Sequence, residues 1–253
     1  MKKLILISCL TLSFQTGWAQ NFYPDNNYIK SYWFDGLSLA KATFKPNKKT
    51  LLIGAGFMAT TAIVMNNDAA IAAFFQRNPS NMAKDLAFGF EKIGNGSYCF
   101  PAMGVLYLSG LIFKNQSIQY TGLQGFKALV IGGGIAEVLK IVVERERPWQ
   151  NSNPYIFHGL YKPKVYSSFP SGHTFDAFAM ATVISQQLKN KWWNVPIYAV
   201  ATGVGLSRLY DNKHWASDVM MGAAIGYCVG KVVMKSNNFP FNKIQKPQAV
   251  AKF

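Results

Sequence analysis

Hydrophobic residues are concentrated in six long segments, which are separated by short stretches rich in turn-forming and charged residues. The segments are rich in Ala, Gly, Leu, Met and Val and are too long for typical strands, so each predicts a helix. They lie at 51–65, 100–114, 126–144, 174–188, 195–211 and 216–234, and two shorter helices are predicted near 68–76 and 80–92. With no repeat and no strand-rich region in the pattern, the sequence predicts an all-α fold, a bundle of about six core helices.

The two ends of the chain have a different pattern. Residues 1–19 combine a basic start, an apolar stretch and a small-x-small sequence ending at Ala19, which is typical of a secretory signal peptide. Residues 20–48 are polar and aromatic and are expected to form an N-terminal arm lying across the core. Residues 237–253 are polar and predict a loose tail. The helical domain is therefore expected to occupy residues 49–236.

The composition narrows the class of protein. Of the 253 residues, 50% are hydrophobic and 15% are charged, which excludes a disordered chain. Lys and Arg total 26 against 11 acidic residues, giving a formal charge of +15. That excess favours an anionic partner such as nucleic acid, anionic lipid or phosphate, and a generic solubilising charge is the alternative.

Two cysteines, Cys99 and Cys228, would remain after the signal peptide is removed. Export makes the destination oxidising, so the two could form a disulfide. Both lie in apolar surroundings, which equally suits two buried free thiols. The sequence leaves this choice open.

Membrane spanning is a separate question, because most apolar runs extend about 15 residues and a span needs roughly 20. The mean hydropathy of +0.07 is low for a protein with six spans. Gly222, Gly226 and Gly230 form a ridge of small residues that suits close helix packing, either in lipid or in a soluble bundle. We therefore expect an exported periplasmic or cell-envelope protein, soluble or membrane-associated, with a membrane-embedded form as the alternative.

The first group of candidate functional residues ends the segment at 126–144. Lys140 and Arg147 are seven residues apart, so on one helix both would project from the same face. Pro148 is expected to end that helix. The two cations could bind an anion, or they could simply be the solvated end of an apolar helix.

The second group is Pro170-Ser171-Gly172-His173, a turn leading into the predicted helix at 174–188. Ser171 is a predicted N-cap residue. Free N–H groups at a helix start, beside a glycine that permits close approach, form a cradle for an anion. His173 would lie beside this cradle, although a surface or capping histidine is the alternative interpretation.

The third group contains Arg208, His214 and Asp218. His214 and Asp218 are four residues apart and are predicted to share a helix face. A carboxylate bound to one imidazole nitrogen fixes the tautomer and raises the basicity of the other nitrogen, as a nucleophilic histidine requires. A His–Asp pair on a helix surface is the alternative.

Together the three groups contain the parts of a phosphoryl-transfer site. The chain has three histidines, and two of them fall in these groups. Lys140, Arg147 and Arg208 supply enough positive charge to hold a phosphate and its developing transition-state charge. The two histidines could serve as nucleophile and acid, and no metal is required.

These motifs, K-x6-R-P, P-S-G-H and S-R-x5-H-x3-D, resemble those of the type 2 phosphatidic acid phosphatase (PAP2) and vanadium haloperoxidase superfamily. Every defining position is present and in order, over residues from about 126 to 230. The amino-terminal half matches only in its helical character. The resemblance implies a helical bundle with the active site at one end, and residues 49–236 would be the PAP2-like catalytic domain.

The resemblance also implies a role for each site residue. His214 would attack phosphorus to form a phosphohistidine, oriented by Asp218, and His173 would protonate the leaving oxygen. The phosphate oxygens would be bound by basic side chains and the P-S-G turn: Lys140, Arg147, Ser171, Gly172 and Arg208. No metal cofactor is implied, and vanadate would be a phosphate-mimicking inhibitor, or a cofactor only in a haloperoxidase.

The leading functional hypothesis is a metal-independent phosphomonoesterase or diphosphatase of the cell envelope that acts on a phosphorylated lipid. The alternatives are a non-specific acid phosphatase acting on soluble phosphomonoesters, a vanadate-dependent haloperoxidase, and a non-catalytic phosphate- or lipid-binding envelope protein. An anionic membrane surface is the expected partner. Nucleic acid is not expected, because the chain is exported and has no recognition motif.

Several other residues near the motifs have no assigned chemistry. His158 and Asp176 are interpreted as structural. Aromatic side chains flank the motifs and could line a groove for a lipid tail, although packing of the loops is favoured for most of them. They are Trp149, Tyr155, Phe157, Tyr161, Tyr166 and Trp215.

Overall fold

The computed structural model describes residues 23–161, 167–188 and 190–235, and the regular elements in these ranges are helices. In chain order they are α1 (Asn26–Phe44), α2 (Lys48–Asn66), α3 (Asp68–Arg77), α4 (Asn81–Gly94), α5 (Gly96–Ile112), α6 (Gln116–Val143), the 3-10 turn η1 (Gly159–Tyr161), α7 (Gly172–Gln187), the 3-10 turn η2 (Lys191–Trp193), α8 (Asn194–Tyr210) and α9 (Ala216–Lys235). The prediction of an all-α fold is confirmed, and each predicted long or short helix has a counterpart.

Two elements differ from the sequence-based expectation. α6 begins at Gln116 rather than near 126, because its first turns bury polar side chains such as Gln119 and Gln124, which a search for apolar runs overlooks. The N-terminal arm contains a regular helix, α1, whose first turn is capped by Asp25. The predicted signal peptide at 1–19 and the predicted tail at 237–253 lie outside the described residues.

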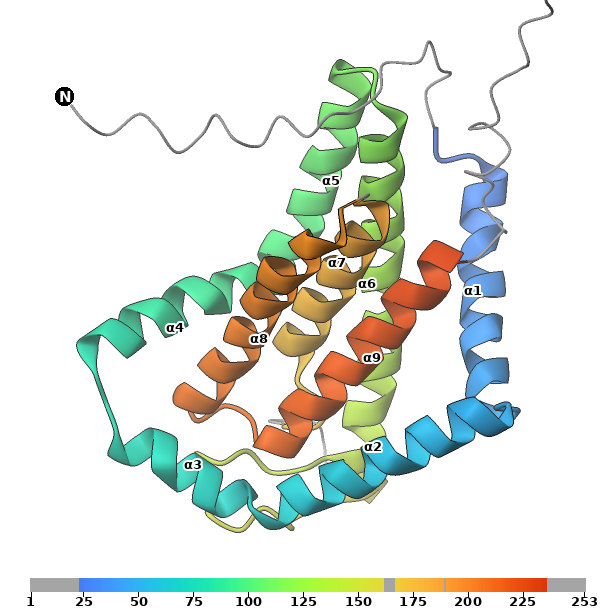
Figure 1. Cartoon of the computed structure of the whole chain (residues 1–253). Coiled ribbons are helices and arrows are strands. Elements are labelled where there is room, and N and C mark those ends of the chain that lie inside the picture. Colours follow the sequence, from blue (N-terminus) through green and yellow to red (C-terminus); the bar gives the residue numbers. More distant parts are fainter. Residues whose placement is uncertain (1–22, 162–166, 189, 236–253) are drawn as a thin grey trace, which may run out of the picture.

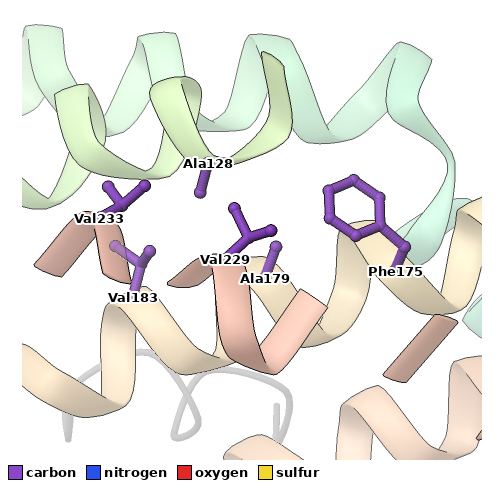
Figure 2. Packing of buried hydrophobic residues seen from close by; sticks show 6 residues of the cluster. All are labelled: Ala128, Phe175, Ala179, Val183, Val229 and Val233. Carbon is purple, nitrogen blue, oxygen red and sulfur yellow. The ribbon is translucent and has the colours of Figure 1, made fainter. Parts of the chain in front are cut away.

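α7 lies at the centre of the bundle and packs against α6, α8 and α9. Figure 2 shows the core cluster shared by α6, α7 and α9, with Phe175 at one end of a row of small and β-branched side chains. Its members are Ala128 from α6, Phe175, Ala179 and Val183 from α7, and Val229 and Val233 from α9. Alanine at two of the six positions allows the helix axes to approach closely.

The glycine ridge of α9 faces α7. A Cβ atom on Gly222 or Gly226 would overlap the carbonyl oxygen of Ser171 or Phe175, and one on Gly230 would overlap the side chain of Thr182. The ridge is therefore a helix-packing surface inside this protein. Because the contact at Gly222 falls on the first turn of α7, the ridge also sets the distance between the starts of α7 and α9.

Four helix ends meet at one end of the bundle, the lower end in Figure 1. They are the C-terminal ends of α6 and α8 and the N-terminal ends of α7 and α9, and all three predicted motifs lie there. α2 and α3 run across this same end, and both contact α9. Part of the amino-terminal half of the chain therefore lies beside the motifs.

The outer surface exposes many large apolar side chains, especially on α1, α2, α4 and α5. α2 and α9 are long and apolar enough to cross a membrane, judged by length and composition alone. Only 6% of α2 is buried, against 39% of α9, so α9 also serves as a core helix. Many exposed apolar side chains on these helices fit association with a membrane.

Both cysteines in the described residues are free thiols, and they do not form a disulfide. Cys99 is buried, as the free-thiol interpretation expects, whereas Cys228 is exposed on α9. Burial raises the pKa of the Cys99 thiol to about 12, which keeps this thiol protonated and unreactive.

Candidate active site

The first motif straddles the end of α6. The helix stops before Glu144, which adopts a left-handed conformation with φ of 42°, so the prediction that the helix continues to Pro148 is wrong. Lys140 lies in the last turn and Arg147 lies in the following loop. The loop returns to the helix end, because Ser167 donates to the Lys140 carbonyl at 3.2 Å and Arg147 Nη2 donates to the Ser167 carbonyl at 3.3 Å. The two cations are thus brought together by the loop and not by a shared helix face.

The second motif begins α7. Ser171 is the N-cap residue, as predicted, although its hydroxyl bonds to the Thr174 hydroxyl at 2.9 Å and makes no capping bond to the backbone. A Cβ atom on Gly172 would lie 3.6 Å from Nζ of Lys140. The lysine ammonium therefore lies against the helix start, where backbone N–H groups and the helix dipole also favour an anion.

His173 has a carboxylate partner that no sequence motif contains. Its Nε2 lies 3.2 Å from Oε1 of Glu91, which comes from α4. The same oxygen lies 3.9 Å from Nη1 of Arg208. The end of α4 can approach this closely because Gly94 has no side chain, and a Cβ there would lie 2.8 Å from the His173 carbonyl oxygen. A single acidic residue in a helix carries no signal in one sequence, so Glu91 is found only through the structure.

Arg208 occupies the last turn of α8 and is largely buried. Its Nη2 pairs with the Asp211 carboxylate. Its Nε is buried and makes no hydrogen bond within the part of the chain that the structure describes. A buried, charged donor without an acceptor is costly, and a phosphate oxygen would satisfy it.

His214 lies in the loop before α9, and its ring is held by the backbone. Nδ1 lies 2.6 Å from the carbonyl oxygen of Ser168. A carbonyl only accepts hydrogen bonds, so Nδ1 carries the proton and Nε2 keeps its lone pair. The predicted bond from His214 to the Asp218 carboxylate is wrong for the described residues. Because α9 begins at Ala216, the two side chains do not share a helix face.

Asp218 is fully buried and binds other groups. Its Oδ1 accepts from Arg145 Nη1 at 2.6 Å, while its Oδ2 accepts from the Ser168 hydroxyl and, at 2.9 Å, from the Trp215 amide. Asp218 therefore contacts Ser168, whose carbonyl binds the His214 ring, and Trp215, the residue that follows His214. The carboxylate is connected to the histidine ring only indirectly.

The electrostatics of each histidine reflect charges from the other motifs. Burial lowers the pKa of His214 well below its ordinary value, and the nearby charge of Arg147 lowers it further. Burial also lowers the pKa of His173, together with the charge of Arg208, whereas Glu91 acts in the opposite direction. Side chains from three separated motifs thus lie within range of one another's fields. We call Lys140, Arg147, Ser171, Gly172, His173, Arg208 and His214 the site cluster.

The remaining residues noted from the sequence lie around this cluster. Trp215 is buried, as the packing interpretation expects, whereas Trp149, Tyr155 and Phe157 are 46%, 50% and 44% exposed. The side chains of Tyr161 and Tyr166 lie outside the described residues. His158 pairs with Glu146 at 2.7 Å. In the described ranges, no group of three or more His, Cys, Asp or Glu side chains could hold a metal ion.

Comparison with known proteins agrees with this geometry. A sequence model of the PAP2 superfamily matches residues 123–241. The chain is 31% identical over 192 residues to a lipid A 1-phosphatase and 36% identical over 156 residues to a lipid A 4'-phosphatase, both from Porphyromonas gingivalis. These alignments cover 74% and 58% of this chain, and 39% and 64% of the respective relatives. The chain therefore spans less than two thirds of either relative.

The fold also has a counterpart among solved structures. It matches the transmembrane PAP2-type phosphatidylglycerolphosphate phosphatase of Bacillus subtilis with a TM-score of 0.54 and 22% identity, covering 83% of this chain and 94% of that one. The fold and the site cluster define a helical bundle with a cationic, two-histidine site at one end. The segment at residues 123–241, which carries the three motifs, belongs to the PAP2 superfamily.

Proposed function

We propose that this protein is a metal-independent phosphatase that removes phosphate from a phosphorylated lipid through a phosphohistidine intermediate. The observation that carries the proposal is the site cluster. Two histidines and three cationic side chains, contributed by three separate parts of the chain, lie together at a helix start. The tautomer of His214 leaves Nε2 as the free nitrogen.

The phosphate would be held before any bond changes. Lys140, Arg147 and Arg208 would neutralise its negative charge, and the N–H groups at the start of α7 would bind further oxygens. The Nε–H of Arg208, which has no acceptor among the described residues, is a further donor for the phosphate. Positive charge around the phosphorus also stabilises the additional negative charge of the transition state.

The chemistry would proceed in two displacements. The Nε2 lone pair of His214 forms a bond to phosphorus, the phosphorus–oxygen bond to the leaving group breaks, and His173 gives its proton to that oxygen. Water then attacks the phosphohistidine and gives a proton to His173, and the phosphorus–nitrogen bond breaks. Inorganic phosphate leaves, and both histidines return to their starting states.

The relatives and the surface both favour a lipid substrate. The two Porphyromonas gingivalis relatives are phosphatases of lipid A, and the Bacillus subtilis structure is a phosphatidylglycerolphosphate phosphatase. The exposed apolar side chains would hold the protein at a membrane, where such headgroups are found. The basic excess would attract anionic lipids to the same surface. Export to the cell envelope remains part of the proposal.

The test is a substrate panel with purified protein in detergent micelles and a chelator present. The panel contains lipid A, phosphatidate, phosphatidylglycerol phosphate, undecaprenyl diphosphate and p-nitrophenyl phosphate. We expect phosphate release from one or more lipids and inhibition by vanadate. His214→Ala should reduce the rate by about 10⁴-fold or more, as loss of a nucleophile does in other enzymes. His158→Gln is the matched control, because that histidine pairs with Glu146 outside the site cluster.

Two outcomes of the panel would count against the proposal. If the wild-type protein releases phosphate from no substrate, the phosphatase hypothesis fails and a non-catalytic phosphate- or lipid-binding protein becomes the better interpretation. If p-nitrophenyl phosphate is hydrolysed and every lipid is left intact, the lipid substrate is wrong and a soluble phosphomonoester replaces it.

A further inference from the structure

Arg145 lies two residues before Arg147, and the three motifs give it no role. Its side chain is only 1% exposed, and its guanidinium is used on every side. Nη1 bonds to the Asp218 carboxylate at 2.6 Å, Nη2 bonds to the Asp68 carboxylate at 2.8 Å, and Nε donates to the Pro154 carbonyl at 2.9 Å. Arg145 therefore joins two buried carboxylates that come from α3 and α9.

The two carboxylates are also connected through Ser217. Asp68 accepts from the Ser217 amide at 3.0 Å and from the Ser217 hydroxyl, which also accepts from Arg145 Nη1 at 2.8 Å. The rings of Phe157 and Trp215 each have centroids 5.4 Å from the guanidinium carbon. A guanidinium that bridges two carboxylates and lies beside two aromatic rings is fixed in one position, and lysine would not reproduce this arrangement.

This network continues to the nucleophile. Asp218 uses its other oxygen, Oδ2, to accept from the Ser168 hydroxyl, and the carbonyl of the same Ser168 accepts from His214 Nδ1. The chain of contacts is thus Asp68, Arg145, Asp218, Ser168 and His214. Each of these five side chains is buried.

We propose that Arg145 and Asp68 are positioning residues, which hold Asp218 and Ser168 so that His214 keeps its proton on Nδ1 and directs Nε2 at phosphorus. This inference rests on the proposed phosphatase function. It gives α3 a part in the chemistry although α3 lies outside the segment matched by the family model, residues 123–241. It also gives a role to the Asp218 carboxylate, which is fully buried near His214 and makes no hydrogen bond to it within the described residues.

Two variants test the network. Asp68→Asn keeps the shape of the side chain and removes its charge. Arg145→Lys keeps the charge and removes the planar guanidinium, whose N–H groups reach both carboxylates. Arg77→Lys is the matched control, because Arg77 is an exposed arginine on α3 itself. A displacement of the nucleophile by about 1 Å can cost about 10²-fold in rate. We expect kcat to fall by about that factor in both variants while KM changes less than threefold, because the phosphate-binding side chains are untouched.

A second readout does not depend on turnover. The chain has only three histidines, so ¹⁵N-histidine NMR can follow each ring, with His214 assigned by its loss in His214→Ala. The wild-type protein and Arg77→Lys should show His214 as a single tautomer with the proton on Nδ1. In Asp68→Asn and Arg145→Lys that signal should change to a mixture of tautomers. If the wild-type protein has no activity, the proposed function fails while this measurement still tests the network.

The inference is overturned if the folded variants keep the single tautomer and a kcat within twofold of Arg77→Lys. It is also overturned if neither variant folds while Arg77→Lys does, since Arg145 and Asp68 would then be needed only to build the fold. Circular dichroism and thermal unfolding decide whether each variant is folded. A rise in KM with unchanged kcat would contradict it as well, because that result places the effect on phosphate binding.

Discussion

Among single residues, the two histidines need opposite protonation states in the proposed mechanism. His214 must be neutral to attack, and its pKa is lowered well below the ordinary value because burial disfavours the charged ring. His173 must be protonated to act as the acid; burial and the charge of Arg208 lower its pKa, whereas Glu91 acts to raise it. The rate should therefore fall as pH rises through the pKa of His173, which sets the upper limit of the active pH range.

Glu91 should control the upper limit of this range. Although burial acts to raise the pKa of Glu91, hydrogen bonds from Asn95 and His173 hold it below its ordinary value, so the carboxylate is charged. This charge in turn raises the pKa of His173. In Glu91→Gln we therefore expect the alkaline limb of the kcat/KM profile to move to lower pH. The loss of rate should be smaller than the roughly 10²–10⁴-fold loss expected on removing the acid in His173→Ala.

The control for this prediction is Asp85→Asn, which removes a charge from an exposed position on the same helix. Its pH profile should coincide with that of the wild-type protein. An unchanged alkaline limb in Glu91→Gln, or a shift of equal size in the control, would show that Glu91 does not set the protonation of His173.

At the scale of helices, the site depends on the close packing of α7 and α9. These two helices supply Ser171, Gly172 and His173 on one side and Asp218 on the other, and the Ser171 amide donates to the Asp218 carbonyl at 3.2 Å. The glycine ridge of α9 permits this approach. Small residues here serve the geometry of the site as well as the stability of the bundle.

Gly226→Ala tests the ridge at a position away from the site cluster. A Cβ atom there would meet the Phe175 carbonyl and the Ala179 amide nitrogen, which are backbone atoms and cannot move alone. We expect the substitution to lower the free energy of unfolding by about 1–3 kcal/mol, as overpacking usually does. Thermal unfolding of the purified protein measures the change.

Gly134→Ala on α6 is the matched substitution, because nothing lies within 4 Å of the added Cβ atom. It should stabilise the protein by about 1 kcal/mol through the higher helix propensity of alanine. If the two alanine variants unfold at the same temperature, the ridge does not determine how closely α7 and α9 pack.

At the scale of the whole molecule, the amino-terminal helix is tied to the bundle by buried charge. Lys127 of α6 lies 2.6 Å from the Asp35 carboxylate and 2.9 Å from the Ser31 hydroxyl, both on α1. The side chains of the ion pair have no exposed surface. Tyr28 of α1 adds a hydrogen bond of 2.7 Å to the Leu123 carbonyl. The segment expected to be an arm is therefore an integral helix of the fold.

Breaking this ion pair on one side should be severe. Asp35→Ala leaves the Lys127 ammonium buried without its carboxylate, which typically costs about 3–5 kcal/mol of stability. The double variant Asp35→Leu/Lys127→Leu removes both charges and should recover most of the loss, since apolar replacements of buried ion pairs are often neutral or stabilising. The midpoint of thermal unfolding, measured for the single and the double variant, tests this expectation. A single variant as stable as the double would mean that the pair is solvated in solution.

Local patterns in the sequence were sufficient to predict most of the helices, although they missed α1 and the first turns of α6. Helix positions follow from the spacing of apolar residues, which a single chain segment already contains. The residues of the three motifs were also singled out from the sequence, because a phosphate site of the kind proposed needs cations and histidines whatever the fold around them. Local spacing was misleading where it assumed an unbroken helix. Arg147 does not share a helix with Lys140, because α6 ends before Glu144. His214 does not share a helix with Asp218, because α9 begins only at Ala216.

The contacts between distant segments were decided only by the tertiary structure. Glu91 beside His173, Asp68 beside Arg145, and Asp35 beside Lys127 each join residues at least 77 positions apart. No local pattern encodes such pairs, because the sequence around an isolated acidic residue on a helix does not reveal whether its side chain faces water or a buried cation. The motifs and the candidate chemistry they carry can be identified in the sequence alone, whereas packing between helices places the carboxylates beside them.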